Sequence, residues 1–133
     1  DLNNYIVNLL TKIIPPTYEE EALTSAAIIV RTNVFRSLYE NNYVNEEEYE
    51  SISTFKKMWK NKFWLHFDKL KEAVEETSYQ YLTNKNQYYF DFNIRDKYKV
   101  PFSSYGANML AKSGYKYRDI LQHYYPDASL EIV

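Results

Sequence analysis

The stretch from Ala22 to Val30, ALTSAAIIV, is the feature that most restricts how this chain can fold. On a helix, its apolar and small residues cover nearly the whole circumference, so the helix has no polar face and should be buried. Pro15-Pro16 stop any helix before it, and Thr17 with Glu20 three residues later has the pattern of a capping box. Further along, the pattern becomes amphipathic and breaks at Asn41-Asn42. The sequence therefore predicts a long, buried central helix on which the other elements pack.

Shorter periodic segments flank this helix on both sides. Apolar residues at helical spacing predict a helix before Pro15, a third helix from about Asn45 to Lys60 and a fourth from Phe67 to Glu76. Alternating, aromatic-rich residues predict a two-stranded hairpin over 79–83 and 86–94. Two last helices are predicted over 103–112, closed by Gly114, and over 117–125. The expected fold is α+β and mainly α, a helical core with a small β-hairpin, in a single domain over residues 1–133.

Composition excludes several classes of function. The net charge is −2, so the chain as a whole lacks the basic character of a nucleic-acid-binding protein. The lysine-rich run from Lys56 to Lys62 is interpreted as a solvated helix face. No cysteine is present, which excludes disulfides, a thiol nucleophile and a cysteine-ligated metal, and His66 and His123 are isolated from each other. We therefore expect no cofactor and no metal site.

The sequence gives no sign of a membrane span, because it contains no run of 18 apolar residues. It does not begin with Met, and we expect that it is a part of a longer exported or membrane-anchored chain. Nothing in the pattern decides whether the domain self-associates.

Three segments carry a resemblance to a known family. Residues 15–32, PPTYEEEALTSAAIIVRT, resemble P-x-x-[FWY]-x-x-E-A-L-x-A-Q-A-x-A-A-R-T, and residues 70–87 resemble a piece with the pattern A-V-x-x-T-x-G-x-V-L-x-Y-x-G. Residues 103–130, SSYGANMLAKSGYKYRDILQHYYPDASL, resemble S-Q-[YW]-G-A-x-x-M-A-x-x-G-x-[ST]-Y-x-x-I-L-x-x-Y-Y-P-G-[TA]-x-L. These patterns, in this order, are similar to the stage II sporulation protein D family, which includes the amidase enhancer proteins. The resemblance implies a reduced version of that family's fold.

The resemblance also implies a chemistry. Sporulation members of the family are lytic transglycosylases, which cut the glycan strands of peptidoglycan together with an amidase partner. Such cleavage needs a carboxylic acid that protonates the leaving glycosidic oxygen. In the family this acid is a glutamate two residues before the proline of an A-E-[MI]-P motif. Pro15 matches that proline, which places Ile13 at the acid position.

The second active-site signature of the family is also altered. Its G-H-G-x-G-M-S-Q stretch corresponds to residues 97–104, KYKVPFSS, so Tyr98 stands at the histidine, Pro101 at a glycine and Ser104 at the glutamine. The zinc site that some members build from a histidine and cysteines cannot be present without cysteine. We expect no catalytic residue, and a non-catalytic relative that binds peptidoglycan or a cell-wall amidase partner outside the cytoplasm, in the cell envelope. The residues expected to take part in binding are Arg31, Tyr105, Ser104, Tyr18 and Tyr98.

Two alternatives stay open. In the first, the chain is an active lytic transglycosylase with a displaced acid, for which Glu20 is the candidate; otherwise Glu19, Glu20 and Glu21 are the acidic first turn of the central helix. In the second, the chain is only a protein–protein interaction module. Arg31 has two interpretations as well, because it either binds a carboxylate or sugar or pairs with an internal acid.

Overall fold

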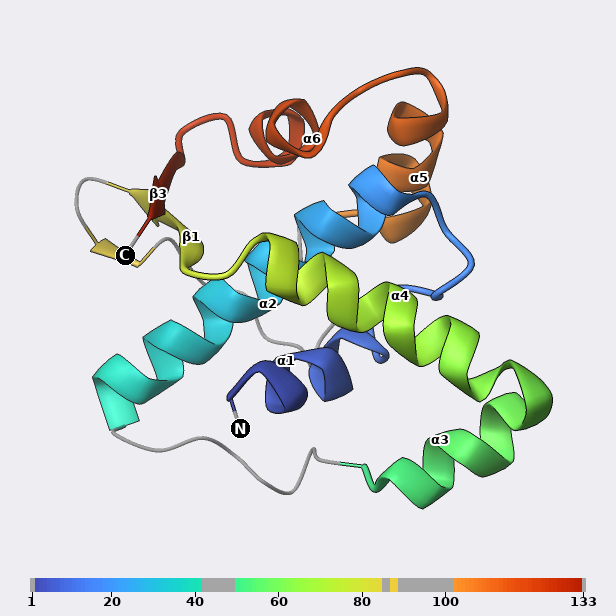
Figure 1. Cartoon of the computed structure of the whole chain (residues 1–133). Helices are drawn as coiled ribbons and strands as arrows, with labels where there is room; N and C mark the ends of the chain where they lie inside the picture. Colours follow the sequence, from blue (N-terminus) through green and yellow to red (C-terminus); the bar gives the residue numbers. More distant parts are fainter. Residues whose placement is uncertain (1, 42–49, 85–86, 89–101, 133) are drawn as a thin grey trace.

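The computed structural model describes residues 2–41, 50–84, 87–88 and 102–132 (Figure 1). The predicted class is confirmed: the fold is α+β and mainly α, with helices packed around one central helix and a small antiparallel sheet at one side. The elements are α1 (Leu2–Leu10), α2 (Glu20–Asn41), α3 (Ile52–Trp59), the 3₁₀ turn η2 (Lys60–Lys62), α4 (Phe63–Glu76), β1 (Gln80–Asn84), β2 (Gln87–Tyr88), α5 (Ser104–Lys112), α6 (Tyr117–Tyr124) and β3 (Ser129–Ile132). None of the helices described combines the length and the apolar character needed to cross a bilayer.

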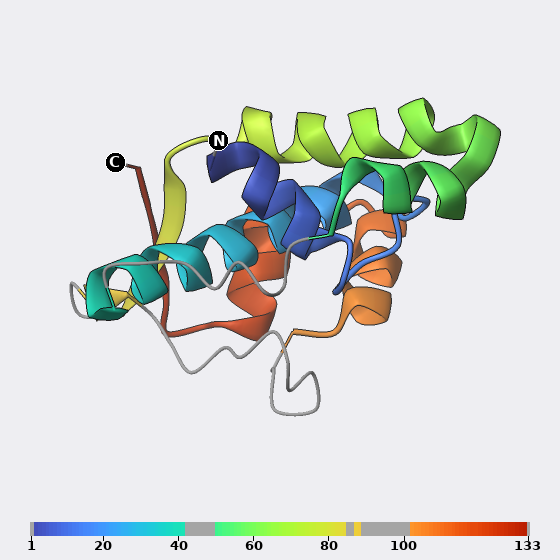
Figure 2. The same ribbon diagram turned by 90° about the horizontal axis from the view of Figure 1, so that it is seen from below.

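Helix α2 is the predicted central helix. All residues from 22 to 32 are buried, and α2 contacts α1, α4, α5, α6, β1 and β2. Figure 2 shows it in the middle of the molecule, with α4 and α6 on opposite sides. The continuous apolar surface of this helix therefore explains the arrangement, because only neighbours on several sides can cover it.

The predicted capping box is wrong. Helix α2 begins at Glu20, three residues after Thr17, because residues 15–18 form a turn in which the Tyr18 N–H donates to the Pro15 carbonyl at 3.2 Å. Glu19 precedes the helix, and its carbonyl accepts from the Leu23 N–H at 3.0 Å. The backbone N–H of Glu19 donates to Asn108 Oδ1 at 2.7 Å. A side chain of α5 thus binds the start of α2 where we expected a local cap.

The other helices follow their sequence signals with shifted ends. Helix α3 begins at Ile52, capped by Ser51, whereas the start expected near Asn45 lies outside the described residues. Helix α4 starts at Phe63 rather than Phe67. At α5, Ser103 accepts a hydrogen bond from the Gly106 N–H at 2.9 Å, and Gly114 has a φ of 96°, which suits the predicted C-terminal glycine.

The sheet has three strands in the order β2-β1-β3. Strands β1 and β2 form the expected hairpin, with Asn84 opposite Gln87, and residues 89–94 lie outside the described residues. Strand β3 was not predicted: it pairs antiparallel with β1, from Gln80 opposite Ile132 to Thr83 opposite Ser129. The sheet therefore returns the end of the chain to the end of α4.

Tyr79, between α4 and β1, has a φ of 69°, in the left-handed region that favours glycine. It stands where the pattern A-V-x-x-T-x-G has its glycine, with Ala73, Val74 and Thr77 at the other positions. The turn therefore keeps the conformation that a glycine would suit, although a tyrosine occupies it.

We predict that Tyr79→Gly raises the free energy of unfolding by about 1 kcal/mol, because glycine adopts a positive φ without the steric cost of a Cβ. Urea denaturation measures this value. Tyr79→Ala is the control, since it removes the exposed ring and keeps the Cβ. Equal stability of the two variants would contradict a backbone origin of the effect.

Candidate functional site

Ile13, the residue that the resemblance places at the family's acid position, has an apolar side chain in apolar surroundings. Ile13 lies in the turn after α1, where its N–H donates to the Leu10 carbonyl at 3.1 Å. Its half-buried side chain packs against the hydrophobic core, and Ile14 beside it is buried. This place carries no group that can donate a proton, and its surroundings suit an apolar side chain.

The three consecutive glutamates have separate positions. Glu20 and Glu21 lie in the first turn of α2, as expected for acidic residues near a helix N-terminus. The Glu21 carboxylate accepts a hydrogen bond from the Tyr117 N–H at 2.9 Å and so binds the N-terminus of α6. Glu21 therefore connects the start of α2 to a helix near the other end of the chain.

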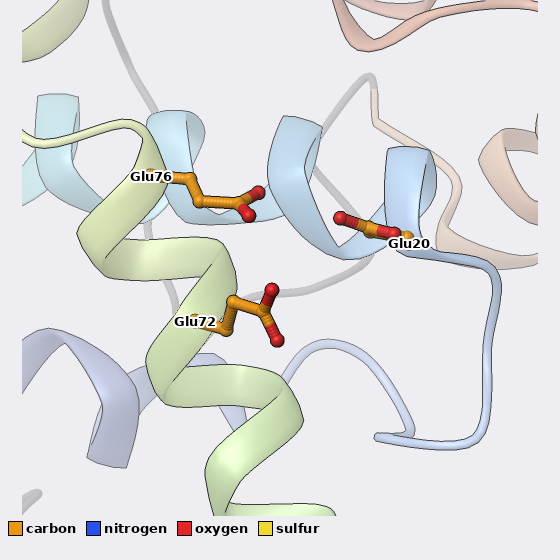
Figure 3. A group of neighbouring side chains, drawn as sticks. All are labelled: Glu20, Glu72 and Glu76. Atoms are coloured by element: carbon orange, nitrogen blue, oxygen red, sulfur yellow. The ribbon is translucent and has the colours of Figure 1, made fainter.

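Glu20 belongs to a cluster of three carboxylates, which we call the glutamate cluster. Glu20 projects from α2, and Glu72 and Glu76 project toward it from α4 (Figure 3). One carboxylate oxygen of each lies within 4.8 Å of the others, and all three side chains are exposed. Glu72 and Glu76 were not predicted as site residues, although their i, i+4 spacing places them on one face of a helix. Their meeting with Glu20 depends on the packing of α4 against α2.

The glutamate cluster has unusual electrostatics. Desolvation raises the pKa of the Glu76 carboxyl, and hydrogen bonds and repulsion from Glu72 and Glu20 raise it further. In the part of the chain that the structure describes, this is the group of acidic side chains close enough to share a metal ion, and carboxylate oxygens are the ligands that hard divalent cations prefer. The cluster can hold a proton or bind a cation, and either would relieve the repulsion.

Arg31 is buried in the core, with 1% of its surface exposed. Nη2 donates to the Val74 carbonyl at 2.6 Å, and Nη1 donates to the Thr77 carbonyl and hydroxyl at 2.6 and 3.1 Å and to the Gln80 carbonyl at 3.2 Å. Burial lowers its pKa to about 10, so it stays charged at neutral pH. These partners take the place of the internal acid in one of the two interpretations of Arg31, because carbonyls at a helix C-terminus carry partial negative charge.

The neighbouring Thr32 adds to the same connection. Its hydroxyl accepts from the Leu82 N–H at 2.9 Å and donates to the Ile28 carbonyl at 2.8 Å. Arg31 and Thr32 together, called the Arg-Thr clamp below, attach the end of α4 and the start of β1 to α2. In this position the guanidinium faces protein groups and has almost no surface for a ligand.

The remaining candidate binding residues are dispersed. Tyr105 on α5 is 65% exposed, while Ser104 at the start of α5 and Tyr18 in the turn before α2 are half-buried. Tyr98 lies outside the described residues. The bond from Glu19 to Asn108 holds α5 beside the start of α2, so the segments that carry Tyr18 and Tyr105 are neighbours.

The small residues of the C-terminal signature have a packing role. A Cβ on Gly106 would overlap the hydroxyl of Tyr124, and Ala107 is fully buried. The Tyr-Gly-Ala stretch therefore meets the first tyrosine of Tyr124-Tyr125-Pro126, and this contact joins α5 to α6. Both parts of the signature serve the fold.

We predict that Arg31→Met lowers the free energy of unfolding by about 3–5 kcal/mol, because it leaves buried carbonyls without their donor. Arg36→Met on the same helix is the control, since Arg36 forms a surface pair with Glu40 at 3.0 Å and should cost less than about 1 kcal/mol. Urea denaturation of both variants measures the difference. Similar costs would contradict a structural role for Arg31.

We also predict that the glutamate cluster makes stability depend on pH. A raised pKa means that the folded state binds the Glu76 proton more tightly than the unfolded state. This contribution is fully present below pH 4.5, the ordinary pKa, and is lost as the pH rises through the folded-state pKa. Glu76→Gln should therefore raise the melting temperature at about pH 7 and have little effect at acidic pH.

The control for this measurement is Glu75→Gln, because Glu75 pairs with Lys71 at 3.8 Å and lies next to Glu76 in the same helix. Glu75→Gln should not raise the melting temperature at neutral pH. The same pH dependence in both variants would exclude the cluster as the cause.

Comparison with known proteins agrees with the resemblance seen in the sequence. A family model described as Stage II sporulation protein (SpoIID) matches residues 1–84, which include Ile13, the glutamate cluster and the Arg-Thr clamp. Stage II sporulation protein D of Bacillus subtilis (strain 168) is 26% identical over 98 residues, which cover 65% of this chain and 29% of that protein. The chain thus spans less than a third of the length of this curated relative. Because the family model matches more than half of the sequence, the chain belongs to the SpoIID family of stage II sporulation proteins.

Proposed function

We propose that this chain is a non-catalytic member of its family, which keeps the fold and binds peptidoglycan without cutting it. The observation that carries the proposal is Ile13, which stands at the position of the family's acid and packs against the core. Loss of a general acid costs a factor of about 10² to 10⁴ in rate. The proposal places the protein outside the cytoplasm, in the cell envelope, with a role in cell-wall remodelling during sporulation.

The retained residues support the same division between scaffold and chemistry. The Arg-Thr clamp, Gly106 and Ala107 all hold elements together, and each matches the family pattern. The positions that depart from the pattern are those that the resemblance assigns to proton donation and to the second active-site signature. Selection for the fold without selection for cleavage would leave this result.

The surface proposed to bind glycan is the region of Tyr105 and Tyr18. Tyrosine offers a flat apolar ring that packs on sugar rings and a hydroxyl that bonds to their polar groups. Tyr105 is exposed at the start of α5, and Ser104 beside it adds a hydroxyl. An amidase partner is the other occupant that the family suggests for this surface.

We predict that the protein sediments with purified peptidoglycan sacculi and releases no anhydro-muramyl products from them. Tyr105→Ala should lower the bound fraction several-fold, because it removes the exposed ring from the proposed surface. Tyr39→Ala is the matched control, since Tyr39 is also exposed and lies near the other end of α2.

Each other result has a definite meaning. Shortened glycan strands with anhydro-muramyl ends would overturn the non-catalytic proposal. Failure to sediment would overturn glycan binding and favour a module that contacts only proteins, such as an amidase. Equal losses in both tyrosine variants would contradict the assigned surface.

A second candidate function is glycan cleavage with a displaced acid, and the glutamate cluster favours it. A general acid must hold a proton at the working pH, and neighbouring carboxylates help it to do so. Glu76 has a raised pKa, and Glu20 lies beside it. On this alternative, Glu20→Gln and Glu76→Gln would each abolish product release from sacculi, and activity that both variants keep would exclude it.

A further inference from the structure

The turn between α3 and α4 lies at one extremity of the molecule. In Figures 1 and 2 it is the part farthest from the sheet. The main neighbours of α3 are η2 and α4, so in the helical hairpin of α3 and α4 it is α3 and the turn that lie at the edge of the molecule, while α4 also packs against α1 and α2. We call residues 56–65, which cover the turn and the adjoining helix ends, the hairpin end.

A chain of aromatic rings holds the two helices together. Phe55 stacks on Trp59 with centroids 5.2 Å apart, Trp59 contacts Phe63 at 6.2 Å, and Phe63 stacks on Phe67 at 5.4 Å. Phe55 and Phe63 are buried. These rings already pack α3 against α4, so the contact between the two helices does not require further apolar side chains.

Three large apolar side chains nevertheless remain exposed at this end. The exposed fractions are 62% for Met58, 64% for Trp64 and 60% for Leu65. Single exposed apolar residues are common on protein surfaces, but three within eight residues at a protruding turn need a reason. Together they expose apolar surface to water, which is energetically unfavourable.

The same end is strongly basic. From Lys56 to Lys69 the chain carries five lysines and one aspartate, a net charge of +4 in a protein whose net charge is −2. Four of these lysines, at 56, 57, 60 and 62, are exposed on the hairpin end. Lys56 Nζ lies 5.7 Å from the centre of the Trp64 ring, so positive charge and exposed indole occupy the same side.

We propose that the hairpin end binds the surface of a membrane that contains anionic lipids. Tryptophan and leucine favour the boundary between headgroups and acyl chains, and lysines beside them reach the phosphates through their long stems. The surface protrudes, as a flat and deformable partner requires, and its positive charge complements the negative charge of the lipids. The inference goes beyond peptidoglycan binding and does not depend on it.

The backbone at Lys60 provides a sensitive variant. Lys60 has a φ of 51°, a conformation that favours glycine, so Lys60→Gly removes a charge while it relieves the backbone. We expect this variant to stay folded, because glycine suits the positive φ at this position, so a loss of lipid binding would point to the missing charge. Trp64→Ser tests the apolar part, because the indole is largely exposed and meets the core through one edge contact with the Phe63 ring at 4.9 Å.

The experiment is sedimentation of the whole protein with vesicles of phosphatidylcholine, alone or with an equal amount of phosphatidylglycerol. We expect binding to the anionic vesicles only, weakened by salt and accompanied by a blue shift of tryptophan fluorescence. Each lysine near the surface should contribute roughly fivefold, so Lys60→Gly with Lys62→Gln should weaken binding roughly 25-fold. Trp64→Ser should weaken binding and abolish most of the shift.

The matched control is the pair Lys112→Gln and Lys116→Gln, which changes the net charge equally at exposed positions elsewhere. Its binding should stay close to that of the wild type. An equal loss in the control pair would mean non-specific charge attraction and would overturn the proposal. So would failure to bind anionic vesicles, or binding to polyglutamate with the same fluorescence shift, which would assign the surface to acidic macromolecules.

Discussion

The structure depends above all on the Arg-Thr clamp. A guanidinium inside a hydrophobic core is costly unless its donors find acceptors, and Arg31 finds them in the carbonyls of Val74, Thr77 and Gln80. These carbonyls lie where α4 ends and β1 begins. The Thr32 hydroxyl accepts from the N–H of Leu82, which lies two residues after Gln80 in β1. The clamp therefore fixes the direction in which the chain leaves α4. Because β3 pairs with β1, the end of the chain is positioned by the same contacts.

This arrangement separates the scaffold from the chemistry that the family signature implies. The turn that carries Ile13 attaches to the core through apolar packing, and the clamp attaches α4 and the sheet from another side of α2. A change from an acid to isoleucine at this turn removes a charge near the core and adds apolar contact. If Ile13 stands at the acid position, as proposed, the fold does not need the acid for its stability, whereas substitution of Arg31 would damage the fold first. The fold needs only apolar packing from position 13, whereas it needs the hydrogen-bond donors of Arg31.

Local patterns predicted the elements, and contacts between distant residues account for what was missed. The apolar run of α2, the alternation of the β-hairpin and the helical pattern over 103–112 are signals within one segment, and each gave the correct element. The capping box at Thr17 failed because the two prolines favour a separate turn and Asn108, far along the chain, binds Glu19. Strand β3 was missed since four residues carry little periodicity and its partner lies about fifty positions earlier. The glutamate cluster and the acceptors of Arg31 likewise arise only when α4 packs against α2.

Helix α4 links two regions of opposite charge. Its start follows Lys60 and Lys62 and carries Trp64, whereas Glu72 and Glu76 lie in its last turns. From Lys62 to Glu76 the helix advances roughly 20 Å, which exceeds twice the screening length of about 8 Å at physiological salt. The basic end and the glutamate cluster therefore act on their surroundings almost independently. An anionic surface that attracts the hairpin end repels the cluster, so the proposed membrane contact would orient the molecule with the hairpin end toward the lipid. The same orientation keeps Glu20 and the start of α2 away from the lipid, which would leave them open to the glycan strand of the proposed function.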